Sequence, residues 1–226
     1  MSYLLYEARI VSGLQALPPL LALPVFALLS WWIWEQGSSN AGLYELVRAF
    51  ELILPLSAGL AAAHLMSIEG DEGFEELRCS YPEPAWRLPL LRAVGASCFS
   101  LLALLAGVMA FRWVYGPFPL IEVLLPALPP TLYLISISLL AGNLTRNYWA
   151  AAAVVISYWF IEFQIGRQLG HPLFLFAGTF PHEQLVYDLN RWLLCTLGVF
   201  FLTVNFWLSV LTKRGVRLRR TPRVHG

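Results

Sequence analysis

The sequence predicts an all-α membrane protein with six transmembrane helices. Hydrophobic residues make up 58% of the 226 residues, and charged residues make up 13%, about half of their share in soluble domains. The mean hydropathy is +0.63, and several apolar runs approach the roughly 20 residues that a helix needs to cross a bilayer. The net charge of +1 does not favour any class of partner, and we expect no nucleic-acid partner.

Short polar or proline-containing turns separate the six apolar runs. Prolines in the first run predict a kink or a late helix start, and Trp31, Trp32 and Trp34 mark its far interface. Gly116 and Pro117 predict a tight turn between the third and fourth runs. The predicted spans are residues 14–34, 44–67, 88–115, 120–142, 148–165 and 191–211.

The distribution of lysine and arginine residues predicts that both termini are cytoplasmic. With this orientation, eleven of the 15 basic residues lie inside and four lie outside, which follows the positive-inside rule. The inner residues are Arg9, Arg78, Arg87, Arg92, Arg146, Lys213, Arg214, Arg217, Arg219, Arg220 and Arg223, and the outer residues are Arg48, Arg112, Arg167 and Arg191. We therefore expect a multi-pass protein of the plasma membrane, with membrane lipid as a partner.

The connection between the second and third spans is strongly charged, and six of the 14 acidic residues lie in it. Phe74, Leu77 and Tyr81 recur at helical spacing and form one apolar stripe, whereas acidic residues occupy another face. Pro82 ends this pattern, because proline disfavours helical geometry in the residue before it. The spacing predicts a short amphipathic helix over residues 70–81, on the cytoplasmic side.

The order Glu69, Gly73, Glu76, Leu77 and Pro82 resembles a motif of ABC-2-type transporter permeases. Phe74 stands where threonine is usual in that family, and Glu75 stands where leucine is usual. In the family, this segment follows the second span and forms a coupling helix that lies in a groove of the ATPase subunit. The resemblance implies a coupling role for Glu69, Glu72, Gly73, Phe74, Glu75, Glu76, Leu77, Tyr81 and Pro82. The alternative interpretation is a solvated acidic loop without a partner.

The resemblance implies the membrane-spanning subunit of an ATP-driven exporter. Six spans are half of a translocation unit in that family, so we expect a homo- or heterodimer of permease chains with two separate ATPase chains. The chain has no GxxxxGK[ST] sequence, so ATP and Mg²⁺ are expected in the partner ATPase. We predict no enzyme activity, metal or cofactor in this chain. The transported substrate stays open, and the alternative function is a six-span channel or structural membrane protein without an ATPase.

The connection between the fifth and sixth spans is long and apolar, but Pro172, Gly178 and Pro181 interrupt it. It is too broken for a full span, and it predicts one or two short helices that dip into the outer leaflet. ABC-2 permeases have a re-entrant helical hairpin at this position, which is a second point of resemblance.

Three charged residues within the predicted spans are functional candidates, because charges inside a membrane are costly. Glu51, Arg112 and Glu162 all lie toward the predicted outer ends of their spans. They are candidates for a salt-bridge cluster that closes an outer gate, or for the lining of a polar vestibule. The alternative is that each side chain reaches the headgroups, or that Arg48 pairs within its own helix with Glu45 and Glu51.

Overall fold

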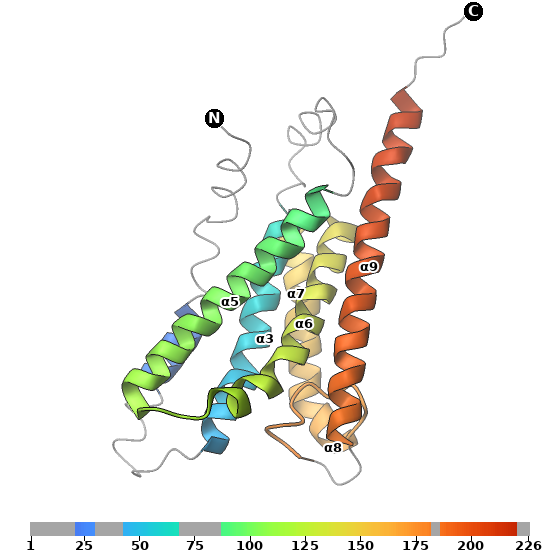
Figure 1. Ribbon diagram of the computed structural model, residues 1–226. Coiled ribbons are helices and arrows are strands. Elements are labelled where there is room, and N and C mark those ends of the chain that lie inside the picture. The colour runs from blue at the N-terminus through green and yellow to red at the C-terminus, as the bar shows by residue number, and fades with distance from the viewer. Residues whose placement is uncertain (1–20, 30–42, 68–86, 182–185, 221–226) are drawn as a thin grey trace, which may run out of the picture.

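The computed structural model describes residues 21–29, 43–67, 87–181 and 186–220 (Figure 1), and these ranges contain helices and turns but no strand. Residues 21–29 are helical. Five long helices are α3 (Leu43–Ser67), α5 (Arg87–Tyr115), α6 (Leu120–Thr145), α7 (Tyr148–Ile161) and α9 (Tyr187–Arg220). A π-helical turn, η3 (Glu162–Gly166), and the short α8 (Arg167–Leu169) extend α7.

Five described helices are long and apolar enough to cross a membrane, which confirms the prediction of an α-helical membrane protein at this level. The second to fifth predicted spans correspond to α3, α5, α6 and the combination of α7 with η3. The sixth, predicted over residues 191–211, begins earlier, because α9 starts at Tyr187. Of the first predicted span, residues 14–34, the structure describes only residues 21–29, which are helical. The rest of this span stays a prediction.

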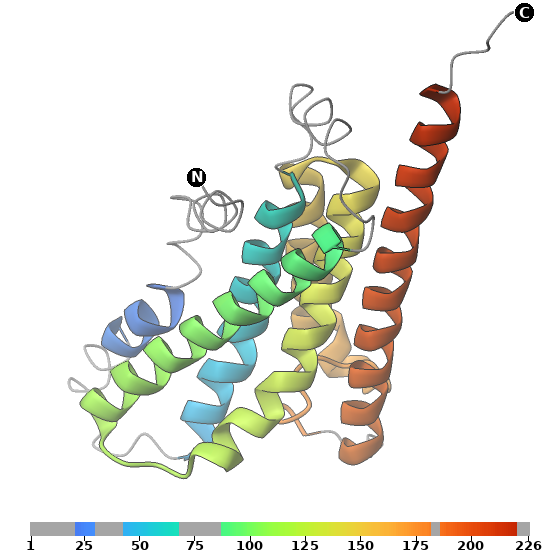
Figure 2. The same ribbon diagram turned by 45° about the horizontal axis from the view of Figure 1, so that its top comes forward.

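Helix α6 lies at the centre of the bundle and packs most extensively against α3 and α9. Its buried side chains include Tyr133, Leu134 and Leu139. Helix α5 crosses α3 and α6 obliquely on one face (Figures 1 and 2), and it packs against residues 21–29, where Leu23 is fully buried. The outward sides of α5 and α9 remain apolar and exposed, as expected for surfaces that contact lipid.

Small residues allow α3 to approach its neighbours closely. A Cβ atom added to Gly59 would lie 2.8 Å from Cγ1 of Val155 on α7, and the Ser138 hydroxyl on α6 donates a 2.6 Å hydrogen bond to the Gly59 carbonyl. Small residues have this role in membrane helix interfaces because dispersion contacts there require close backbones. The sequence of α3 therefore fixes the spacing of three helices.

A polar contact also joins α6 to α9. The Asn143 side-chain amide donates to Oδ1 of Asn205 at 2.8 Å and to the Ser209 hydroxyl at 3.0 Å. Such interhelical hydrogen bonds are a common use of polar side chains in membrane bundles. This contact holds the central helix against the last one.

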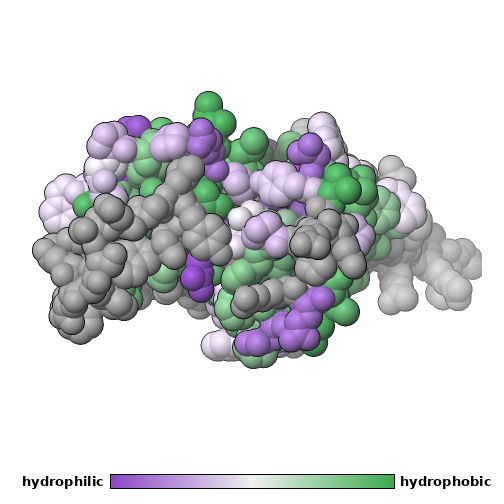
Figure 3. Space-filling model, turned by 90° about the horizontal axis from the view of Figure 1, so that it is seen from below, coloured by the Kyte–Doolittle hydropathy of each residue, from purple (hydrophilic) through white to green (hydrophobic). Residues whose placement is uncertain are grey.

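The two ends of the bundle differ in charge. All acidic residues in the described ranges lie toward the end where α3 and α9 begin and α7 finishes, which we call the acidic end and which Figure 3 shows end-on. These residues are Glu45, Glu51, Glu122, Glu162 and Asp188. The opposite end, called the basic end, carries Arg87, Arg92, Arg146, Lys213, Arg214, Arg217, Arg219 and Arg220.

The connection from α7 to α9 differs from the predicted helical hairpin. Only the three residues of α8 continue the helix, and residues 171–181 run as successive turns. The cause is local: Gly170 adopts a left-handed conformation with φ of 54°, and Pro172 and Pro181 lack the N–H that a helix requires. The prediction of short helices in this part is therefore wrong, although the chain does fold back against the bundle.

Candidate functional site

Residues 170–181, which we call the covering segment, lie across the acidic end of the bundle. Phe174, Leu175 and Phe176 are fully buried there. The Phe176 ring packs edge-on against Trp159 and Phe163 of the α7–η3 helix, with ring centroids 5.7 and 6.2 Å apart. A segment without regular structure is thus inserted into the apolar core, where its backbone polar groups need partners.

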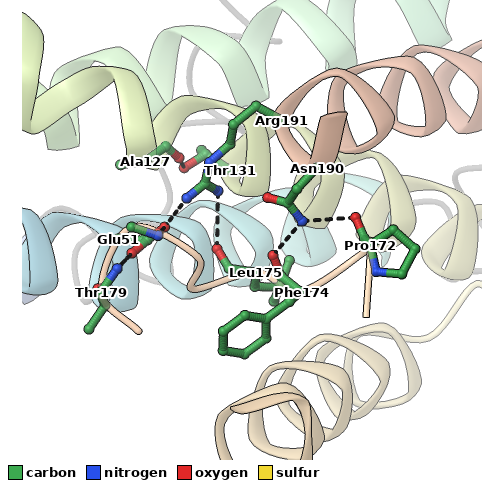
Figure 4. Close-up of polar contacts among 10 residues, drawn as sticks. Glu51, Ala127, Thr131, Pro172, Phe174, Leu175, Thr179, Asn190 and Arg191 are labelled. Carbon is green, nitrogen blue, oxygen red and sulfur yellow. Dashed lines mark hydrogen bonds and ion pairs between the residues drawn. The ribbon is translucent and has the colours of Figure 1, made fainter. Parts of the chain in front are cut away.

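Glu51 on α3 supplies the first of these partners. Its carboxylate is fully buried and accepts hydrogen bonds from the Gly178 N–H at 3.0 Å and from the Thr179 N–H and hydroxyl, the latter at 2.6 Å. It also forms an ion pair with the guanidinium of Arg191 on α9 (Figure 4). One carboxylate therefore joins α3, the covering segment and α9.

The first turns of α9 supply the remaining contacts. Arg191 donates to the Leu175 carbonyl at 3.3 Å and lies 4.8 Å from the centre of the Tyr187 ring. The Asn190 amide donates to the carbonyls of Pro172 and Phe174, at 2.8 and 2.9 Å (Figure 4). Two adjacent residues of one helix thus satisfy three carbonyls of the covering segment, of which those of Phe174 and Leu175 belong to fully buried residues.

The charge of Arg191 needs Glu51 for a further reason. Arg191 lies near the N-terminus of α9, where the helix dipole is positive and disfavours a cation. A buried arginine without a carboxylate there would be costly. The pair and its hydrogen bonds connect three parts of the chain and fix the covering segment, although Nε of Arg191 and Oδ1 of Asn190 are buried without a hydrogen-bond partner among the described residues.

A second pair lies beside the first. Glu162, in the π-helical turn η3, has a side chain that is 5% exposed, and its Oε1 lies 3.1 Å from Nε2 of His171 in the covering segment. π-Helical turns usually occur as single turns within α-helices, and they are frequent at functional sites. The covering segment is therefore attached to the bundle through two separate buried carboxylates.

The structure does not bring the three predicted gate residues into one cluster. Glu51 and Glu162 are buried, each in its own pair, whereas Arg112 is exposed on α5. Arg48, considered as a partner of Glu51, has its guanidinium 5.9 Å from the ring of Phe180. The partner that the sequence does not reveal is Arg191, whose position at the start of the last span indicates only an outer basic residue.

The hydrogen bonds and ion pairs of Glu51, Asn190 and Arg191 hold the covering segment in place. Among the described residues, no group of three His, Cys, Asp or Glu side chains is arranged to hold a metal ion. The residues predicted to couple to an ATPase, Glu69 to Pro82, lie outside the described residues. A scan against protein-family models and a search of curated proteins found no match to this chain.

Proposed function

We propose that this chain is the membrane-spanning subunit of an ATP-driven ABC-2-type exporter, in which a separate ATPase drives export. One observation carries the proposal: the acidic segment with the Glu69, Gly73, Glu76 and Leu77 motif connects α3 to α5. In the resembling family, the coupling helix occupies this connection.

The charge distribution supports a cytoplasmic position for this segment. It follows Ser67 and precedes Arg87, and both of these residues lie at the basic end of the bundle. Lysine and arginine residues concentrate on the cytoplasmic side of membrane proteins. The segment would therefore face the compartment that contains ATP and the ATPase.

The network at the opposite end supplies a gate for such a cycle. With the basic end inside, the covering segment closes the outer end of the bundle, attached by Glu51 and Arg191. ATP-driven movement at the inner end would change the packing of α3, which carries Glu51 near its outer end. An exporter needs two packed states of this kind, and α3 connects the two ends directly.

The decisive experiment is affinity purification of the tagged protein in mild detergent, with mass spectrometry of the proteins that copurify. We expect the wild type to recover a P-loop ATPase, and a Leu77→Asp variant to lose it, because the new charge interrupts the apolar stripe that would enter the ATPase groove. Cys79→Asp is the matched control, since helical spacing places residue 79 on the opposite face. The control should retain the ATPase.

The functional prediction concerns coupling. We expect substitution of Gly73 or Glu76, or a charge at Phe74 or Leu77, to separate ATPase activity from transport without preventing membrane insertion. The measurement is ATPase activity and substrate export in proteoliposomes, once the partner is known. Normal transport by Leu77→Asp would contradict docking through this segment, and a wild type that recovers no ATPase would favour the channel or structural alternative.

A further inference from the structure

We propose that Glu162 and His171 form a proton-binding site at the acidic end, in which one bound proton keeps the covering segment in place. The inference does not depend on an ATPase, since it rests on the geometry of the pair alone. It concerns a different carboxylate from the one that pairs with Arg191.

The His171 ring shows which nitrogen carries a proton in this arrangement. Its Nδ1 accepts a hydrogen bond from the Leu173 N–H at 3.2 Å, so Nδ1 itself carries no hydrogen. The proton of the neutral ring then lies on Nε2, which is 3.1 Å from Oε1 of Glu162, and the ring donates to the carboxyl group. A second proton on the ring would place two N–H groups against each other and break the Leu173 bond.

The other oxygen of Glu162 indicates where the bound proton lies. Oε2 is buried and no described donor meets it in hydrogen-bonding geometry, although the Tyr158 hydroxyl and the Leu175 N–H both lie close to the carboxyl group. An ionised carboxylate with one buried, unpartnered oxygen is costly, whereas a carboxylic acid has a neutral O–H there. The structure therefore fits a pair that holds one proton on Glu162 beside a neutral His171.

The packing around Oε2 leaves little room for a larger ligand. A Cβ atom added to Gly166 would lie 2.6 Å from Oε2 and 2.7 Å from the Phe174 ring. A metal ion needs several oxygen or nitrogen ligands around it, and the described residues do not supply them. A proton needs neither space nor further ligands, and His171, with a side chain 32% exposed, gives it a path to water.

Other ionisable groups near Glu162 come from each neighbouring element. Tyr158 lies on its own helix and Tyr133 on α6, with their ring centroids 5.5 Å apart; both hydroxyls stay neutral up to about pH 9. Arg191 on α9 bonds to the Leu175 carbonyl and is paired with Glu51. Glu162 and His171 are therefore the acid and base that face each other at this contact.

The site predicts that the covering segment loosens both at low and at high pH, for two different reasons. Below the pH range in which the pair holds one proton, Nδ1 of His171 also becomes protonated. It can then no longer accept the hydrogen bond from the Leu173 N–H. Above it, Glu162 loses its proton, and the buried carboxylate requires water that only a loosened segment admits. Protection of the covering segment should therefore be greatest at an intermediate pH and fall on both sides.

The test is hydrogen–deuterium exchange of the full chain in lipid nanodiscs, from about pH 4 to about pH 9, corrected for the intrinsic rate at each pH. We follow a peptide that includes residues 170–181 and use a peptide of α6 as an internal reference for folding. In the wild type we expect exchange to become about tenfold faster on each side of the optimum, as expected for the loss of one hydrogen bond.

Two variants each remove one side of the profile. Glu162→Gln cannot ionise and resembles the protonated acid, so protection should persist at high pH and still fall at low pH. His171→Asn cannot gain a proton, yet its side-chain oxygen can still accept from Leu173, so the loss at low pH should disappear. A flat wild-type profile overturns the proposal, and so does a Glu162→Gln variant that loses protection at high pH as the wild type does. If Glu162→Gln also exposes the α6 peptide, the His171→Asn profile decides: retention of its low-pH loss overturns the proposal.

Discussion

Replacement of one member of the Glu51–Arg191 pair leaves the other as a buried charge. In Glu51→Gln, the amide oxygen can still accept from Arg191, but the guanidinium loses its compensating negative charge and otherwise contacts the Leu175 carbonyl and the Tyr187 ring. Because an uncompensated buried charge costs about 3–5 kcal/mol, this variant should lose about that much unfolding free energy.

The opposite replacement should cost less. In Arg191→Met, Glu51 retains three donors, the N–H groups of Gly178 and Thr179 and the Thr179 hydroxyl. The loss is then about that of one hydrogen bond to a charged group, 1.5–3 kcal/mol. The double variant Glu51→Gln/Arg191→Met leaves no buried charge at either position. It should be no less stable than Glu51→Gln, so the two substitutions couple by about 2 kcal/mol or more.

The assay is unfolding in mixed micelles by titration with a denaturing detergent, with helicity measured by circular dichroism. Arg112→Met is the matched control, because it removes an arginine that is exposed in the same half of the bundle; its change should stay within about 0.5 kcal/mol. The reasoning is refuted if the two single substitutions add to within about 0.5 kcal/mol, because independent sites behave in this way.

Two further predictions concern helix spacing and orientation. Gly59→Ala should lower the unfolding free energy by about 1–3 kcal/mol, since the new Cβ would lie 2.8 Å from Val155. In the same unfolding titration, Gly59→Ala/Val155→Ala should recover part of the lost unfolding free energy. A double variant as unstable as Gly59→Ala would contradict the predicted clash. In a cysteine-free background, a cysteine at Pro117, which is exposed in the turn between α5 and α6, should react with a membrane-impermeant maleimide in intact cells. Labelling only after permeabilisation would reverse the proposed orientation.

The apolar runs determined which segments become helices, and this could be read from the sequence. A bilayer requires every backbone polar group to be satisfied within the chain, so a run of about 20 apolar residues has few alternatives to a helix. For this reason the predicted spans 44–67 and 88–115 agree with α3 and α5 to within one residue. The prolines and glycines between residues 170 and 181 excluded a full span, again through local backbone geometry.

The same local signals did not predict how the covering segment would fold. The segment is apolar and short, and its composition suited short helices as well as turns. Its conformation depends on Asn190 and Arg191 of α9. These side chains donate hydrogen bonds to its carbonyls only once α9 packs beside it. A chain of turns is stable in the core because distant residues satisfy its backbone.

The sequence by itself also identified Glu51 and Glu162 as unusual, because the cost of a charge in a membrane segment does not depend on its neighbours. Only the tertiary structure decided their partners. Arg191 is 140 positions from Glu51 along the chain, whereas Arg48 is nearby on the same helix, and no periodicity connects the more distant pair. Ion pairing depends on which side chains are brought within a few ångströms in a medium of low dielectric constant, and helix packing alone determines that.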